Sequence, residues 1–220
     1  MKNYWSTHYK KNKNIAYPAE AVIRIFKGTF PNLNFKHNIN SKILDIGFGD
    51  GRHLFFFKNL DLDVYGVEIN QDIVDQKKLN NFFKLKVGSS SSLPFKNNFF
   101  DIIFAWNSCY YMGDDKNNLN FQNSVEEISK KLKENGHLIV SVPTKNSFIF
   151  KDSTVIKKKY RIIKKDYFKL RNGEIMRYFH NIADVKKEFS TCFKNFSFSK
   201  ISIDCFGLPY EWIVFVAQKK

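Results

Sequence analysis

The sequence has few cysteines and no long apolar run. Its three cysteines, Cys109, Cys192 and Cys205, are widely separated, so they predict neither a disulfide framework nor a metal site. No segment approaches the roughly 20 apolar residues of a membrane-spanning helix, and the N-terminus lacks the apolar stretch of a signal peptide. These absences argue against a disulfide-stabilised secreted protein and a helical membrane protein, and they favour a cytoplasmic location.

Acidic residues are also scarce. Asp and Glu number 21 against 36 Lys and Arg, which gives a net charge of +15. Such a charge favours acidic partners, namely nucleic acid, phosphorylated metabolites or an anionic surface. The alternative is a general overuse of lysine and asparagine along the chain. With 220 residues, 43% of them hydrophobic and 24 of them phenylalanine, the chain predicts one large α/β domain with an aromatic core.

Residues 43–51 carry the most informative pattern. The apolar run 43–46 predicts a strand buried on both faces of a parallel sheet, and Gly47, Gly49 and Gly51 follow it at alternate positions. Glycine tolerates positive φ and has no Cβ, so the backbone can turn sharply and lie against a ligand. Residues 51–59 then predict a helix whose first amides face the same crevice, which favours a ligand with anionic groups.

The spacing indicates which ligand. Dinucleotide-binding sites use G-x-G-x-x-G, whereas here Arg52 occupies the position of the third glycine, which argues against a nicotinamide oxidoreductase. The next predicted strand, 63–67, is followed directly by Glu68, whose carboxylate can accept hydrogen bonds from both hydroxyls of a ribose. Together with Asp45 and the Leu-Pro-Phe segment at 93–95, this order resembles the class I S-adenosylmethionine-dependent methyltransferases of the small "type 11" kind.

The resemblance implies S-adenosylmethionine as the cofactor and assigns roles around it. Asp45 would orient the loop and the methionine amino group, Gly47 and Gly49 would allow close approach of the backbone, and Glu68 would hold the ribose. Gly51 completes the glycine turn. For Glu68 the alternative role is that of a helix N-cap.

Further cofactor contacts follow from the same resemblance. Ile69 and Trp106 would offer apolar surface, and Tyr17 would belong to a lid over the crevice. Ser89, followed by Ser90, stands where the family usually has an aspartate that reads the adenine amine. The alternatives are a core position for Trp106, a hydrophobic staple for Tyr17 and an ordinary loop position for Ser89.

The predicted fold is a seven-stranded Rossmann-like methyltransferase sheet flanked by helices, with an antiparallel last strand. Helices are expected at 18–29, 51–59, 71–80, 123–135 and 183–193, and strands at 42–46, 63–67, 83–87, 99–105, 138–142, 197–203 and 211–217. We expect a single domain over 1–220, in which residues 1–30 form an N-terminal lid and helix. Residues 144–182 are expected to form a small substrate cap with a hairpin at Asn172-Gly173.

The catalytic group is harder to predict. An alcohol acceptor needs a general base near the attacking oxygen, and the candidates are His180, Tyr110 and His8. His180 lies in the cap, Tyr110 follows the fourth strand and His8 lies in the lid. Each of them can equally be a structural or solvated residue. No metal is expected.

The leading functional hypothesis is O-methylation of a small anionic acceptor, such as a nucleotide-linked or phosphorylated sugar of surface-polysaccharide biosynthesis. One alternative is a methyltransferase acting on RNA or another nucleic acid, favoured by the basic run 157–171. Another is a non-catalytic cofactor-binding interaction protein, suggested by the serine at position 89. The sequence does not decide the oligomeric state.

Overall fold

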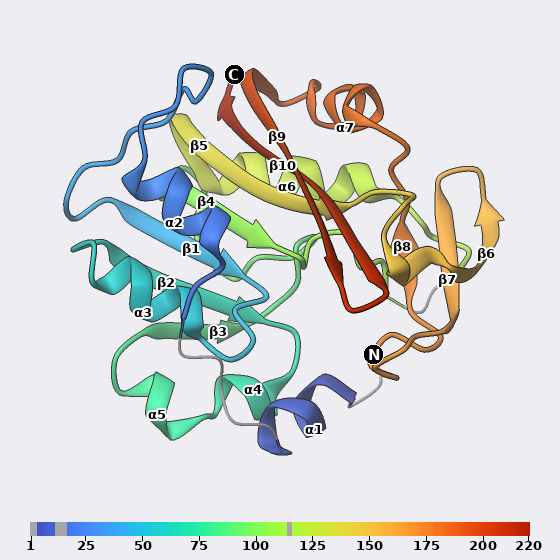
Figure 1. The fold of residues 1–220 in the computed structure, drawn as a ribbon. Coiled ribbons are helices and arrows are strands. Elements are labelled where there is room, and N and C mark those ends of the chain that lie inside the picture. Colours follow the sequence, from blue (N-terminus) through green and yellow to red (C-terminus); the bar gives the residue numbers. More distant parts are fainter. Residues whose placement is uncertain (1–3, 12–16, 114–115) are drawn as a thin grey trace.

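A computed structural model describes residues 4–11, 17–113 and 116–220, and a seven-stranded sheet forms its centre (Figure 1). The strands stand in the order β3-β2-β1-β4-β5-β10-β9. Their bounds are β1 (Lys42–Ile46), β2 (Asp63–Glu68), β3 (Lys84–Val87), β4 (Phe100–Trp106), β5 (Leu132–Pro143), β9 (Phe193–Cys205) and β10 (Leu208–Lys219). The predicted Rossmann-like sheet is therefore confirmed.

The strand pairing aligns the binding edge of the sheet. β1 lies parallel to β2 and β4, β2 is parallel to β3, and β4 is parallel to β5. β10 runs antiparallel to both β5 and β9, so the predicted antiparallel last strand is confirmed. The carboxyl ends of the parallel strands share one edge, which is where open α/β sheets bind their ligands.

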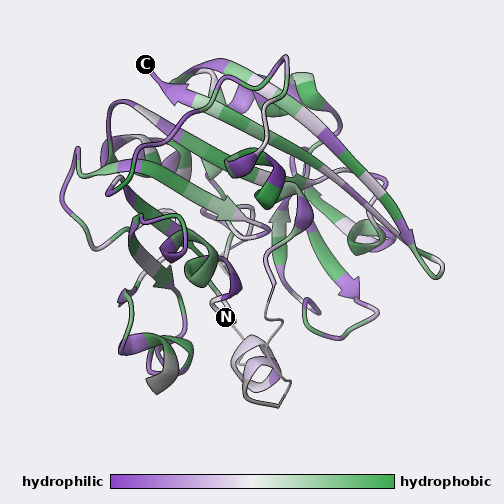
Figure 2. Cartoon of the chain, turned by 60° about the vertical axis from the view of Figure 1, so that its left-hand side comes forward, coloured by the Kyte–Doolittle hydropathy of each residue, from purple (hydrophilic) through white to green (hydrophobic). Residues whose placement is uncertain are grey.

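Helices cover both faces of this sheet. Successive strand residues point to opposite faces, so Ile43 packs in the core with α2 and α3, whereas Leu44 packs in the core with α6 and α7. Figure 2 shows hydrophobic segments along the central strands, as two-sided burial requires. The helix bounds are α2 (Glu20–Lys27), α3 (Arg52–Lys58), α4 (Gln71–Val74), α5 (Lys77–Asn80), α6 (Phe121–Lys131) and α7 (Ile182–Phe189).

The predicted helix over 71–80 is interrupted. It divides into α4 and α5, and Gln76 between them has an extended backbone. The buried residues Ile73 and Leu79 explain the break, because they would lie about 120° apart around one straight helix. Two short helices allow both side chains to reach the core.

The segment after β5 forms a second, three-stranded sheet. β6 (Asp152–Lys157), β7 (Tyr160–Lys165) and β8 (Ile175–Arg177) pair antiparallel in that order, after the short 3-10 helix η1 (Phe148–Phe150). The tight turn lies between β6 and β7, at residues 158–159. Asn172 and Gly173 lie in the longer connection, residues 166–174, between the antiparallel strands β7 and β8, where Asn172 accepts a hydrogen bond from the Asp166 amide. We call residues 144–182 the cap.

The first described helix, α1 (Tyr4–Lys11), lies at the carboxyl edge of the sheet, close to α4 (Figure 1). It precedes α2 in the chain, but it packs far from α2. No helix in the described part of the chain is long and apolar enough to span a bilayer.

Candidate active site

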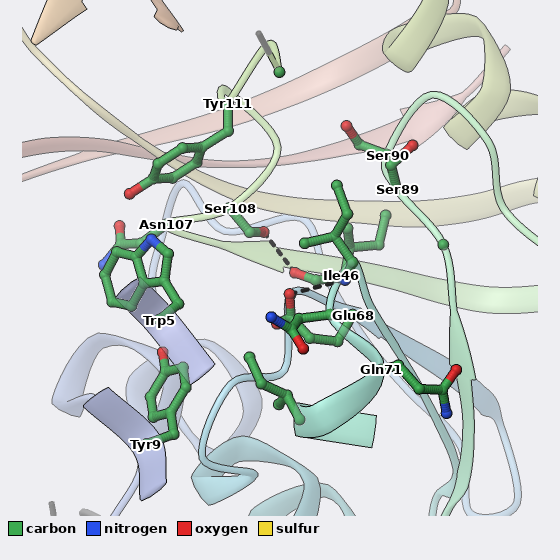
Figure 3. Close-up of a pocket in the computed structure, with 16 residues that line it drawn as sticks. Trp5, Tyr9, Ile46, Glu68, Gln71, Ser89, Ser90, Asn107, Ser108 and Tyr111 are labelled. Carbon is green, nitrogen blue, oxygen red and sulfur yellow. Dashed lines mark hydrogen bonds between the residues drawn. The ribbon is translucent and has the colours of Figure 1, made fainter. Parts of the chain in front are cut away.

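A cavity of about 490 Å³ opens at the carboxyl ends of β1, β2 and β4 (Figure 3). Its walls come from the turns after these strands, from the loop after β3 and from α1. The described lining residues are Trp5, Tyr9, Ile46, Gly47, Glu68, Ile69, Asn70, Gln71, Ile73, Gly88, Ser89, Ser90, Asn107, Ser108, Tyr111 and Gly113. The lining therefore contains both predicted cofactor residues and residues that the sequence did not predict.

The glycine turn after β1 has the expected backbone. Gly47, Gly49 and Gly51 all have positive φ, at +73°, +55° and +80°. A Cβ on Gly47 would lie 2.6 Å from the Ser108 Cβ, and one on Gly49 would lie 2.6 Å from the Tyr9 hydroxyl. The turn therefore needs glycine for its backbone and for the close approach of its neighbours. Gly51 is the N-cap of α3 and lies outside the cavity lining.

Glu68 is held in place at the end of β2. Its carboxylate accepts hydrogen bonds from the amides of Ile69 at 2.9 Å and Gly49 at 3.4 Å. Burial raises the pKa of Glu68, and these two hydrogen bonds oppose that shift. The side chain lines the cavity with its oxygens fixed, which suits it to accept hydrogen bonds from a ribose.

Asp45 lies beneath the same turn and is 1% exposed. Its Oδ2 has no hydrogen-bond partner among the described residues. Burial raises the pKa of Asp45, and the negative charge of Glu68 adds to that shift. A buried carboxylate oxygen without a donor is costly, so a cationic amino group nearby would stabilise it. Asp45, Glu68 and the bare glycine turn thus fit the cofactor that the resemblance implies.

The loop after β3 supplies a polar wall. Ser89 and Ser90 both line the cavity, and the Ser90 hydroxyl lies 3.1 Å from that of Ser124 on α6. Ser89 lies 3.1 Å from the Ser91 hydroxyl. Ile69 also lines the cavity and is 41% exposed, so its side chain is accessible to a ligand. The cavity therefore contains the three residues predicted on this side.

The aromatic cover differs from the prediction. Tyr17, which was predicted to belong to the cofactor lid, is 77% exposed and is not among the described lining residues of the cavity. Trp5 and Tyr9 on α1 lie over the cavity instead, with their rings stacked 5.9 Å apart. Burial and the nearby Glu68 carboxylate raise the pKa of Tyr9 well above its ordinary value. The sequence signal for this cover was the spacing of Trp5 and Tyr9, which lie four residues apart and therefore on one face of a short helix.

Trp106 also lies away from the cavity. Its ring is stacked at 5.7 Å on Phe104 and lies 6.2 Å from His53, so it packs against the core on the α3 side of the sheet. His53 itself is buried and accepts a hydrogen bond from the Ala19 amide, and burial lowers its pKa to about 3. Trp106 is not among the described lining residues of the cavity.

Tyr110 is replaced at the cavity by its neighbour. Tyr110 is 1% exposed within the core and does not line the cavity, whereas Tyr111 does. The two rings are stacked 5.0 Å apart. Burial raises the pKa of the Tyr111 hydroxyl, which accepts a hydrogen bond from the Arg171 side chain. The structure thus places Tyr111, the neighbour of the predicted Tyr110, at the cavity.

The two histidine candidates lie outside the cavity. His180 is exposed, and its ring packs edge-on against Tyr178 at 4.8 Å. His8 lies on α1 with its ring edges against Trp5 and Tyr9, and it does not line the cavity. Neither histidine is therefore placed as the general base.

Asn107 and Ser108 are two polar lining residues that the sequence did not predict. The Ser108 hydroxyl donates to the Ile46 carbonyl at 2.5 Å, which ties the end of β4 to the end of β1. Asn107 has a φ of +55°, and its side-chain oxygen accepts from the Ser141 hydroxyl at 2.7 Å. Their position directly after β4 at the carboxyl edge was the signal that could have found them.

Comparison with known proteins agrees with this geometry. Residues 44–140 match the family model described as "Methyltransferase domain". None of the curated proteins compared matches the sequence. A solved S-adenosylmethionine-dependent methyltransferase from Methanosarcina mazei is similar, with a TM-score of 0.65 and 16% identity over 87% of this chain and 98% of that one.

Two further solved structures share the fold. One from Thermotoga maritima, described as a possible histamine N-methyltransferase, has a TM-score of 0.57 and 19% identity over 82% of this chain and 83% of that one. The YcgJ protein of Bacillus subtilis has a TM-score of 0.56 and 13% identity over 99% and 98%. At sequence identities this low, the structural similarity is evidence for a shared fold alone.

Proposed function

We propose that this chain is a class I S-adenosylmethionine-dependent methyltransferase and that it methylates a hydroxyl group of a small anionic acceptor. A nucleotide-linked or phosphorylated sugar of surface-polysaccharide biosynthesis is the acceptor class that we favour. S-adenosylmethionine, when bound, supplies a methyl group on a sulfonium, which is a good leaving group. The protein therefore has mainly to position the acceptor and exclude water.

One observation carries the proposal, namely that Glu68 and Gly47 line one cavity, with the buried Asp45 two residues before Gly47 and the Gly49 amide bonded to Glu68. The unpartnered Asp45 Oδ2 would hold the amino group of the cofactor, directly or through water. Glu68 would hold the ribose, and the backbone at Gly47 and Gly49 would lie against the amino-acid tail. Ser89, Ser90 and Ile69 would contact the adenine side.

The acceptor would lie beside Asn107, Ser108 and Tyr111. These side chains are polar and uncharged, and no lysine, arginine or histidine is among the described lining residues. Burial keeps the Tyr111 hydroxyl protonated, so it would orient an acceptor hydroxyl by hydrogen bonding without acting as a strong base. Positioning in a site covered by Trp5 and Tyr9 is therefore the main contribution that we assign to the protein.

We treat the whole chain as one methyltransferase domain, with α1 as its lid and residues 144–182 as its substrate cap. The positive charge supports an anionic acceptor, because a basic field attracts phosphorylated molecules. The free cysteines, one buried and one exposed among them, agree with a reducing cytoplasm as the site of action.

A nucleic-acid substrate is the second candidate, because lysines of the cap are exposed on β6 and β7. A non-catalytic cofactor-binding protein is the third, with the serine at position 89 as its support. Turnover on RNA and not on nucleotide sugars would favour the second candidate, whereas tight cofactor binding without turnover on any acceptor would favour the third.

The test of the proposal measures cofactor binding and turnover separately. Calorimetry with S-adenosylhomocysteine should give a saturable site, and Glu68→Ala should weaken that binding at least tenfold. Glu20→Ala on the exposed face of α2 is the control and should change it less than twofold. A methyl-release assay on nucleotide-linked sugars should then give turnover. Unchanged affinity in Glu68→Ala would contradict the assigned cofactor site.

A further inference from the structure

The cap carries more than half of the excess positive charge. Residues 144–182 contain eleven Lys and Arg against three Asp and Glu, a net charge of +8 out of +15 for the chain. Lys164, Lys165 and Lys169 are exposed, and no carboxylate of the described residues lies within 4 Å of their amino groups. The charge is therefore concentrated on one element and available to a ligand, which a uniform overuse of lysine does not explain.

The loop 166–171, which follows β7, is rigidly built. The Asp166 side chain is fully buried and accepts hydrogen bonds from the Leu170 amide at 3.0 Å and from the Arg171 guanidinium at 3.1 Å. The Asp166 amide donates to Asn172 Oδ1 at 2.7 Å. Lys169 has a φ of +58°, a left-handed conformation that persists only when surrounding contacts impose it.

This loop presents aromatic side chains to solvent. Tyr167 is 70% exposed and Phe168 is 46% exposed, with their rings 5.0 Å apart and edge-to-face. Phe168 is supported from below by Phe148 at 5.9 Å. Two exposed rings beside three exposed lysines, on a loop with a fixed shape, form a surface suited to a ligand that is both planar and anionic.

The same loop reaches the rim of the cavity. Arg171 points inward, with its guanidinium 5.2 Å from the centre of the Trp5 ring and hydrogen-bonded to the Tyr111 hydroxyl. Trp5 and Tyr111 both line the cavity. The lysines and the exposed rings thus lie on the outer side of the loop, and Arg171 on its inner side forms part of the acceptor entrance. The described cavity residues beside this entrance, Asn107, Ser108 and Tyr111, are uncharged.

We propose that loop 166–171, together with Lys164 and Lys165, binds the nucleoside diphosphate end of the acceptor. The base stacks on Tyr167, the lysines contact the phosphates, and the uncharged sugar enters the cavity past Trp5 and Tyr111. This inference rests on the proposed function and adds the group by which the acceptor is recognised. It explains why the basic charge lies outside a cavity whose described lining has no lysine, arginine or histidine.

The experiment uses uridine diphosphate as the probe and the full chain saturated with S-adenosylhomocysteine. Calorimetry at low salt should give a saturable site. The double variant Lys165→Glu, Lys169→Glu should weaken it at least tenfold, and Tyr167→Ala at least threefold. The matched control reverses two exposed lysines elsewhere, Lys27→Glu and Lys36→Glu, and should change the affinity less than twofold.

Cofactor binding distinguishes failure of this inference from failure of the proposed function. If S-adenosylhomocysteine binds and uridine diphosphate does not, or if the cap variants bind it as the wild type does, the inference is overturned and the cofactor site stands. If pyrophosphate binds as tightly as uridine diphosphate and Tyr167→Ala has no effect, the loop does not recognise the nucleoside, and that part of the inference is overturned. A ten-residue oligouridine that binds far more tightly, with a steep salt dependence, would assign the loop to RNA instead.

Discussion

At the scale of single residues, Gly49 shows how closely the lid approaches the cofactor turn. Its missing Cβ leaves the space in which the Tyr9 hydroxyl lies. We expect Gly49→Ala to lower the free energy of unfolding by about 1–2 kcal/mol, since an L residue at positive φ costs about that much. The displaced Tyr9 should also disturb α1, so S-adenosylhomocysteine affinity should fall at least tenfold by calorimetry.

Gly207 provides the matched control for that substitution. It has a φ of +89°, and a Cβ there would meet nothing within 4 Å. Gly207→Ala should therefore show a similar loss in urea-denaturation experiments and leave cofactor affinity unchanged. Equal affinities in the two variants would mean that contact with Tyr9 has no part in shaping the site.

Asp45 predicts a pH dependence of stability. A carboxyl group whose folded pKa is raised binds its proton more tightly in the folded than in the unfolded state. Its contribution to the free energy of unfolding is therefore greatest at low pH. That contribution is lost as the pH rises from the unfolded-state pKa, near 4, through the higher folded pKa.

Without cofactor, Asp45→Asn should therefore stabilise the protein relative to the wild type at pH 8, by about 1–3 kcal/mol, because it removes a buried charge whose Oδ2 has no hydrogen-bond partner among the described residues. The gain should shrink at pH 5. Urea denaturation at the two pH values measures both quantities. S-adenosylhomocysteine should bind Asp45→Asn more weakly, and a gain that grew toward low pH would contradict this account.

At the scale of secondary-structure elements, the strands were the most predictable part. β1, β2 and β4 are buried on both faces, so their sequences are apolar runs that end in glycine or polar residues. The cofactor side of the site follows from these strand ends, which is why Asp45, Gly47 and Glu68 could be selected from the sequence. Periodicity did not reveal the break between α4 and α5, because that break depends on where Leu79 packs.

The residues on the acceptor side were less predictable, because the direction in which each side chain points depends on how the chain turns at the end of a strand. After β4 the chain turns at Asn107, whose φ is positive, and this decides which neighbours face the cavity. Tyr111 faces it and Tyr110 does not, while Trp106 packs in the core behind. A shift of one residue along the chain turns each side chain to the opposite side. Residue types alone do not show whether such a shift occurs. The histidines were selected by chemistry alone, without any evidence of position.

Arg171 joins the cap to α1, and its loss should loosen that helix. Its guanidinium lies over Trp5, a cation–π contact worth about 0.5–2 kcal/mol. We expect Arg171→Gln to speed amide hydrogen exchange in residues 4–11 several-fold, as measured by mass spectrometry. Arg161→Gln is the control, because Arg161 lies 4.4 Å from the centre of the Tyr178 ring, within the cap. Equal protection of α1 in both variants would refute the link.

At the scale of the whole molecule, charge separates the two ligands. The cofactor cavity contains Glu68 and no described cationic side chain, whereas the cap carries a net charge of +8. Raising the salt concentration from 50 to 300 mM should therefore lower kcat/KM for an anionic acceptor at least threefold, because salt screens exposed charges. The Kd of S-adenosylhomocysteine, measured in the same buffers, should change less than twofold. A kcat/KM that is insensitive to salt would argue for an uncharged acceptor.

The position of β10 inside the main sheet has a consequence for biosynthesis. Among the described strands of that sheet, β9 pairs only with β10, which is synthesised after it and which separates it from β5. While the ribosome is still adding β10, β9 has no strand to join and the edge of β5 is bare. A nascent chain stalled before residue 208 should therefore recruit chaperones that cover exposed strand edges, and release from them should follow the emergence of β10.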